Sequence, residues 1–370
     1  MKKLSVLSAL LLLASCTYPF SVELEDTGER SLVVDANILI GNTSTVKLSY
    51  LQPLQVGQRS TGAVRPSANV FLEDEKGNTY PAADNYGTYT IPAFTATGSE
   101  KYRLTVVADG KTYRSEWVVP VAPPTITELA FRSDKDYVYL DLSMEDDGNG
   151  SGYAAAVIEE IWNFHADYIR NLGFDPESGS VYTLMDPDDS HYWCWRKRSV
   201  ETQSIIDYSG MEGKVQSYAL SRFSRSDSRN HREYHAKVKL WNLTKEQYEY
   251  RKMLEENASI GGNLFSPEPG EVRGNLYCES SPAEKAFGYV NISQVVTREI
   301  SLGNEYFVYK GPSTKLIEIS PEDYMERWGK GYMPIDYITN ADGFNVPGWG
   351  LGRCYDCLEA GGTLEKPEFE

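Results

Sequence analysis

The sequence lacks most of the residues and motifs on which catalysis and nucleotide binding depend. It has only four histidines in 370 residues, and it contains no Gly-x-Ser-x-Gly, no P-loop and no Gly-x-Gly-x-x-Gly. These absences exclude the nucleophile elbow of α/β-hydrolases and the common phosphate-binding loops. Carboxylates are plentiful, so a pair of acids of the glycosidase kind stays open, although no feature selects such a pair. We therefore expect a protein that is not an enzyme and that needs no cofactor or metal.

Long hydrophobic runs are also absent. The longest begins at Leu4 and has 11 residues, whereas a transmembrane helix needs roughly 20. It follows two lysines and leads to Leu-Ala-Ser before Cys16, which resembles the lipobox of bacterial lipoproteins. The resemblance implies that residues 1–15 are a signal peptide, that Cys16 is acylated at the start of the mature chain, and that the polar segment 16–30 is a tether. The alternative is an ordinary secretory leader with a chance cysteine.

Basic side chains are scarce. Without the two lysines of the leader, the chain has 34 basic and 53 acidic side chains, a net charge of −19. Such a surface repels phosphates and anionic glycolipids, which argues against nucleic acid and lipopolysaccharide as partners of the folded part. We expect contact with a lipid bilayer through the acyl chains on Cys16, because two or more lipid signals anchor a protein stably.

Cysteine is rare as well, with five residues in the chain. If Cys16 carries lipid, an even number remains, which in an oxidising compartment favours two disulfides in one of three pairings. The remaining cysteines are Cys194, Cys278, Cys354 and Cys357. The last two also have the spacing of half a zinc site or of a redox pair, but no second close pair and no βαβ context accompany them. We expect structural disulfides.

The segments that are present have mostly the character of β-strands. From residue 31 onward, alternating or β-branched runs recur about every 8–12 residues with turn residues between them. The clearest two runs flank Asp109 and Gly110, which tolerate the positive φ angles of a type I′ turn, so we expect a hairpin there. This pattern predicts an immunoglobulin-like β-sandwich over residues 31–119.

A proline-rich joint at residues 120–124 indicates a boundary, because prolines stiffen a linker and cannot donate to a β-ladder. We expect a larger β-rich domain with a few short helices over residues 125–370. Within it, 153–162 is ambiguous between strand and helix, and we favour strand. Helices are expected over 244–257, which opens with a capping box, and over 320–329, which opens with Ser-Pro.

Several motifs invite a functional interpretation, and for each the structural one is favoured. His231 and His235 are not in the His-Glu-x-x-His order and lead straight into a strand, so they do not form a metal pair. The acidic loops 145–151 and 186–189 lack the ligand spacing of a calcium loop. The Trp-Cys-Trp sequence at 193–195 is interpreted as a disulfide packed between two rings.

A series of short motifs along the chain resembles one lipoprotein family. The motifs are Leu32-Val-Val-Asp-Ala-Asn-Ile38, Gly87-Thr-Tyr-Thr-Ile91, Tyr102-Arg-Leu-Thr-Val106, Asp109-Gly-Lys-Thr-Tyr-Arg-Ser115, Cys194-Trp195, Thr244-Lys-Glu-Gln-Tyr248, Gly274-Asn-Leu-Tyr277, Gly288-Tyr-Val290, Cys354-Tyr-Asp-Cys357, Gly361-Gly362 and Lys366-Pro-Glu-Phe369. Their order is similar to that of the Bacteroidetes family called domain of unknown function 4249 (DUF4249), over nearly all of the mature chain. The resemblance implies an outer-membrane lipoprotein, lipid-anchored on the periplasmic face or the cell surface. Such proteins are commonly encoded beside TonB-dependent receptors, with no established enzymatic activity and no defined binding residue.

Together, the lipobox and this resemblance lead to one hypothesis. The chain is expected to be a non-enzymatic surface lipoprotein that acts as a capture or lid component beside a TonB-dependent nutrient transporter. Two rival hypotheses stay open: a structural or adhesive surface protein, and a hydrolase that uses a pair of carboxylates.

Overall fold

The computed structural model describes residues 31–51, 66–96, 100–145, 151–199, 204–210, 215–259, 274–307 and 311–369. This part of the chain is mainly β, with five sheets and two α-helices, which confirms the expected fold class. The expected signal peptide, the tether and Cys16 lie outside the described residues. Within the described ranges, no helix has both the length and the apolar character needed to cross a bilayer.

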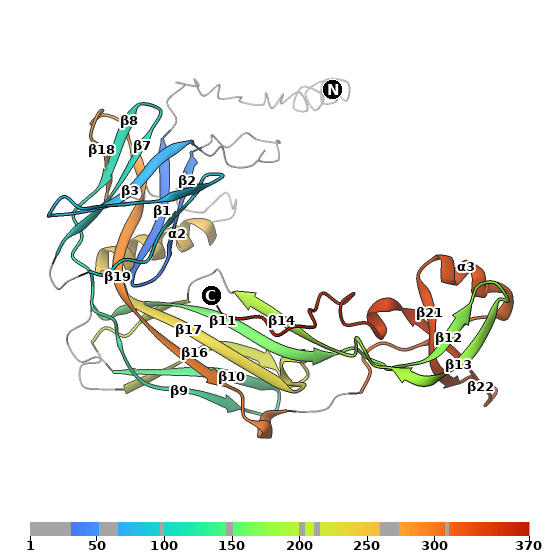
Figure 1. The fold of residues 1–370 in the computed structure, drawn as a ribbon. Coiled ribbons are helices and arrows are strands. Elements are labelled where there is room, and N and C mark those ends of the chain that lie inside the picture. Colours follow the sequence, from blue (N-terminus) through green and yellow to red (C-terminus); the bar gives the residue numbers. More distant parts are fainter. Residues whose placement is uncertain are drawn as a thin grey trace, which may run out of the picture.

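The first part of the fold is a β-sandwich whose two sheets enclose one hydrophobic core (Figure 1). One sheet contains β1 (Leu32–Ile40), β2 (Ser44–Tyr50), β6 (Thr88–Ile91) and β5 (Ala83–Asn85). The other contains, in order, β18 (Leu276–Cys278), β8 (Lys111–Ser115), β7 (Tyr102–Ala108), β3 (Ala68–Asp74) and β4 (Thr79–Pro81).

Local sequence explains these strands directly. In β2 the apolar residues Val46 and Leu48 are buried while the alternating residues Thr45 and Lys47 are exposed, because successive side chains of a strand point to opposite faces. The expected hairpin joins β7 to β8, and its turn residues Asp109 and Gly110 have φ angles of 51° and 73°. These positive angles are the ones that a type I′ turn requires, so the hairpin prediction is confirmed.

A long strand, β19 (Ala286–Ser301), passes from this sandwich into the rest of the molecule (Figure 1). Its first half lies parallel to β1, from Ala286 opposite Leu32 to Gln294 opposite Ile40. Its second half lies antiparallel to β17 (Glu233–Asn242). The first sandwich is therefore completed by strands that follow residue 274. The division into domains at 120–124 stays a prediction about folding units.

The second sandwich forms the body of the molecule. Its first sheet continues from β19 through β17 and β11 (Tyr153–His165) to β14 (Trp193–Ser199), with β15 (Ser204–Asp207) also paired to β11. The facing sheet contains β16 (Val215–Ser224), β10 (Tyr137–Glu145) and β9 (Thr125–Ser133). The ambiguous segment 153–162 is thus a strand, as favoured. It shows no alternation because β11 is buried on both faces.

Both expected helices are present. In α2 (Lys245–Ser259), the backbone N–H of Gln247 donates to the Thr244 hydroxyl over 3.2 Å, which is the capping contact that the sequence predicts. The helix packs on β1, where Gln247 and Arg251 both donate to the Asn37 side chain. The second, α3 (Tyr324–Gly329), follows a 3₁₀ turn that has Pro321 in its first position.

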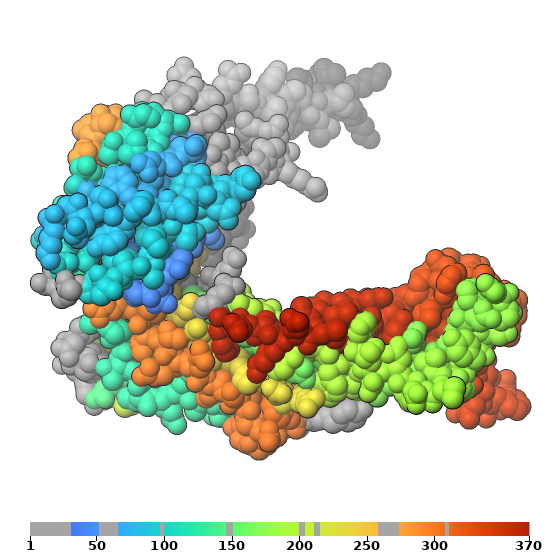
Figure 2. All heavy atoms as spheres, in the orientation of Figure 1, coloured from blue at the N-terminus to red at the C-terminus, as the bar shows by residue number. Residues whose placement is uncertain are grey.

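A projecting arm extends from the body (Figures 1 and 2). It consists of residues 168–189 and 313–353, and it contains a β-hairpin, a three-stranded sheet and α3. The hairpin is β12 (Arg170–Asp175) with β13 (Ser180–Asp188), and the sheet is β20 (Ile317–Glu318), β22 (Asn345–Leu351) and β21 (Tyr332–Thr339). The hairpin packs on the sheet through Phe174, whose ring centroid lies 5.4 Å from that of Trp349.

One disulfide is present. Cys194 of β14 is bonded to Cys357, and their Cα atoms are 5.7 Å apart. Cys278 and Cys354 are buried free thiols, which corrects the expectation of a second disulfide. They do not pair with each other because Cys278 lies in the core of the first sandwich, whereas Cys354 lies in a separate small core at the root of the arm. A redox pair of Cys354 with Cys357 is not formed either.

Candidate functional site

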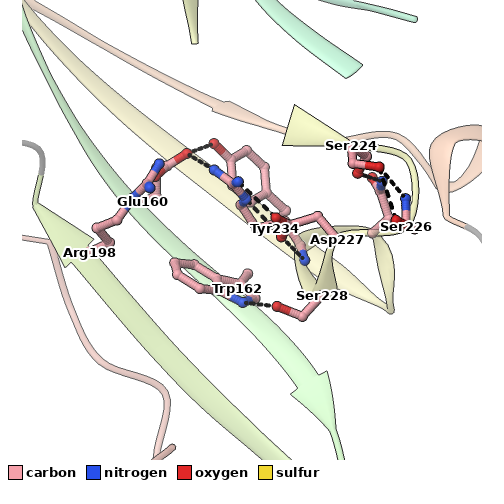
Figure 3. A network of polar contacts seen from close by, with 10 residues as sticks. Glu160, Trp162, Arg198, Ser224, Ser226, Asp227, Ser228 and Tyr234 are labelled. Carbon is pink, nitrogen blue, oxygen red and sulfur yellow. Dashed lines mark hydrogen bonds and ion pairs between the residues drawn. The ribbon is translucent and has the colours of Figure 1, made fainter. Parts of the chain in front are cut away.

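The body contains a buried network of charged groups centred on Glu160 (Figure 3). Glu160 lies in β11 with no exposed surface. One carboxylate oxygen accepts hydrogen bonds from the Tyr234 hydroxyl, at 2.6 Å, and from Arg229, at 3.1 Å. The other oxygen is paired with Arg198 of β14. The network therefore links the first sheet of the body to the turn that precedes β17.

Arg229 is held from its other side by Asp227. Two guanidinium nitrogens donate to the two Asp227 oxygens, each over 2.9 Å. Burial opposes the ionisation of Asp227, but the bonds from Arg229 outweigh it and lower the pKa of this carboxyl. Burial raises the pKa of the Tyr234 phenol well above its ordinary value, and the neighbouring Glu160 carboxylate raises it further. The lowered pKa keeps Asp227 charged and the raised pKa keeps Tyr234 neutral at neutral pH.

This arrangement does not suit acid–base catalysis. Both oxygens of Glu160 are occupied by cations or a phenol, and no surface of the side chain reaches solvent. The adjacent Glu159 points to the opposite face of the strand, where it pairs with Lys197 over 2.6 Å. A glycosidase pair needs two carboxylates facing one substrate across a cleft, so these two acids do not form one.

The four histidines do not gather into a metal site. His231 precedes β17 and His235 lies within it, so the two are not on one helical face. The ring of His231 stacks on that of His165, with centroids 4.2 Å apart, whereas His235 stacks near Trp195. Within the described ranges, no three His, Cys, Asp or Glu side chains are placed to hold a metal ion.

Of the two acidic loops, 146–150 lies outside the described residues. At the other, Asp188 accepts hydrogen bonds from Ser190 and pairs with Arg170 over 2.6 Å. These contacts, Ser190 first, lower the pKa of Asp188. Residues 186–188 end β13 and so belong to a strand, whereas the sequence predicts a turn there; the Asp188 oxygens bind Ser190 and Arg170 of the neighbouring strand β12.

Two depressions in the surface are small and have charged linings. The first, of about 330 Å³, is lined by Val33, Asp35, Lys47, Leu48, Ser49, Gly87 and Thr88. The second, of about 210 Å³, is lined by Ile205, Asp207, Tyr248, Lys252 and Glu255. Sites for small organic ligands span about 300–1,000 Å³, so the first depression lies at the lower end of that range and the second below it.

The arm is where large apolar side chains reach solvent. Of the 18 large hydrophobic residues that are exposed in the described part of the chain, seven lie in the arm, although the arm is only about a fifth of that part. We call these seven the arm set. They are Tyr182, Met185, Ile317, Met325, Trp328, Tyr337 and Phe344. The sequence analysis missed them; the available signal was a large apolar residue in a turn-rich stretch, as at Phe344 in Asn-Ala-Asp-Gly-Phe-Asn.

The C-terminal segment 358–369 forms a strap along the outer edge of β14. Thr363 and Trp195 exchange two backbone hydrogen bonds, at 2.7 and 2.9 Å. Lys366 lies over the Trp195 ring, 4.7 Å from its centroid, and contacts Nε2 of His235 at 2.9 Å. Cys194 forms a disulfide, as the interpretation of this motif predicts. Successive side chains of β14 point to opposite faces, so Trp193 and Trp195 do not enclose the disulfide, and that part of the interpretation was wrong.

These features define a mainly β protein of two linked sandwiches with a projecting arm, on which large apolar side chains are exposed. The chain belongs to the family described as Domain of unknown function (DUF4249), whose profile matches residues 17–299. The resemblance found in the sequence is thereby confirmed. The match ends before residues 313–353, which form the larger segment of the arm.

The chain can also be compared with curated proteins and with solved structures. No curated protein matches the sequence. Among solved structures, a segment of two fibronectin type-III domains from chicken tenascin is similar at 10% identity, over 58% of this chain and 91% of that one, with a TM-score of 0.15.

Proposed function

We propose that the protein is a lipid-anchored, non-enzymatic accessory of the outer membrane, which serves as a capture or lid component beside a TonB-dependent nutrient transporter. The lipobox ending at Cys16 and membership in the DUF4249 family support the location at the outer membrane. The observation that carries the role is the arm set, because Met and aromatic side chains are the ones enriched in protein interfaces. A component that works by contact with another protein needs such a surface.

The hydrolase alternative receives less support. The fully buried carboxylate of Glu160 is bound by two arginines and a tyrosine. The adhesive alternative shares the need for an exposed apolar surface, so the identity of the bound protein distinguishes it from the transporter role.

Purification from the native membrane tests the proposal. The tagged chain is extracted from the outer membrane in mild detergent, and copurifying proteins are quantified by mass spectrometry. We expect a TonB-dependent transporter to be enriched, and we expect Cys16→Ala to move the chain to the soluble fraction and to lose the transporter. Repeated absence of a transporter, or an intact leader with an unmodified Cys16 thiol, would contradict the proposal. Recovery of proteins from other cells or from a matrix would favour adhesion.

A further inference from the structure

The arm set exposes a large total area of apolar side chain, distributed over the hairpin, α3 and the three-stranded sheet. Met185 is 101% exposed and Phe344 is 68% exposed, and the other five are exposed by about half. At about 200 Å² for a whole large side chain, the seven exposed fractions total roughly 800 Å², which is about the share of one partner in a standard interface.

The charges around this surface have one predominant sign. Residues 168–189 and 313–353 contain five basic and eleven acidic side chains, a net charge of −6. Some of these charges are paired with one another, as Arg170 is with Asp188 and Lys330 is with Glu326. The remaining acidic excess makes the electrostatic potential around the arm negative, and a negative potential attracts the basic side chains of a partner.

Several contacts hold the arm in the conformation in which it would bind, and preorganisation of this kind lowers the cost of binding. Asp167, at the root of the arm, accepts backbone hydrogen bonds from Ser313 at 3.0 Å and Thr314 at 2.9 Å, which join the two chain segments that enter the arm. The Tyr168 hydroxyl donates to the Thr314 carbonyl at 2.7 Å. Farther out, the rings of Phe174, Tyr324 and Trp349 pack against one another.

From the exposed apolar area, the charge and the contacts that hold the arm, we infer that the arm is a docking surface for another protein, one whose contact face is apolar at its centre and carries lysine or arginine at its rim. Pairing of two copies of this chain arm to arm is disfavoured, because two arms of charge −6 repel each other. A bilayer of anionic lipids is disfavoured for the same reason. This inference rests on the proposed function, which supplies the expectation of a protein partner in the outer membrane.

Photo-crosslinking of the full-length lipidated protein in its native membrane tests the inference. A photoreactive amino acid replaces Met185 or Phe344 in the arm. The control position is Val215 of β16, which is 57% exposed on the body. In parallel, the double variant Met185→Asp with Phe344→Asp is compared with Val215→Asp for the amount of partner recovered. All replaced side chains are exposed, so melting temperatures are expected to stay unchanged.

We expect both arm positions, and not Val215, to crosslink one protein at a region that contains lysine or arginine. We expect the double arm variant to recover about tenfold less of that protein, which corresponds to about 1.4 kcal/mol, while Val215→Asp recovers as much as the unaltered chain. An adduct with the mass of a second copy or of a phospholipid would overturn the inference. Equal crosslinking from Val215, or no protein adduct from the arm, would overturn it as well.

The two proposals fail in different ways. If the transporter copurifies equally with the double arm variant, the proposed function stands and the arm is not its docking surface. If the arm crosslinks a protein of the stated chemistry that is not a transporter, the docking surface stands and the proposed function is wrong.

Discussion

Replacing Glu160 by glutamine tests how strongly the buried network stabilises the body. A hydrogen bond to a charged group contributes about 1.5–3 kcal/mol, and removing one member of a buried ion pair costs about 3–5 kcal/mol. Here Arg229 keeps its two bonds to Asp227, and Arg198 is 47% exposed and regains water. We therefore expect a loss of about 3 kcal/mol, at the lower end of that range.

Chemical unfolding in guanidinium chloride measures this loss. Intrinsic tryptophan fluorescence follows the unfolding; one of the seven tryptophans that contribute is Trp162, which donates from its indole N–H to Ser228 beside the network. The midpoint is expected to fall while the slope stays the same, because the surface exposed on unfolding is unchanged. Glu159→Gln is the matched control: its partner Lys197 is partly exposed, so the expected loss is about 1 kcal/mol. Equal losses at the two positions, or no loss at Glu160, would refute the reasoning.

Three further predictions follow from features described above. Cys357→Ser removes a disulfide whose residues are 163 positions apart, and the gain in chain entropy of the unfolded state is expected to lower the free energy of unfolding by about 5 kcal/mol. The shift of the unfolding midpoint, with and without reductant, measures this loss. The pKa of His235 is lowered by burial first and by Lys366 second, so the folded state resists protonation. The contact of the strap is then expected to weaken as the pH falls below about 6.5. Amide protection factors of the strap should fall at pH 5.5 in the unaltered chain and not in His235→Gln. Gly288→Ala should abolish folding of the first sandwich, because Gly288 has a φ of 118° and a Cβ there would lie 1.8 Å from a carbonyl oxygen of β1. Soluble yield and circular dichroism measure this effect. Gly311→Ala, with open space around it, should fold normally.

The local elements of the fold could be predicted because their signals lie within a few residues. The turn at Asp109 and Gly110 and the cap at Thr244 each depend on side chains that act on the adjacent backbone. The alternation in β2 likewise records which face meets the core. These features were therefore available to sequence reasoning.

The long-range arrangement could not be predicted in the same way. The pairing of β19 with β1 joins strands about 250 residues apart, and nothing in either strand identifies the other. The core of the arm gathers Phe174, Tyr324 and Trp349 from distant segments. The partner of Cys194 was open for the same reason, because it depends on the path by which the chain returns from the arm. The candidate docking surface belongs to that path and was missed with it.

The strand β19 has a consequence for any attempt to study the two sandwiches apart. A fragment that ends at the proline joint contains β1 and β8 but neither β19 nor β18, which pair with them. Two bare strand edges would then face solvent, and exposed edges recruit other chains. Shortened versions of this protein should therefore keep residues 274–301, and a fragment without them is expected to aggregate.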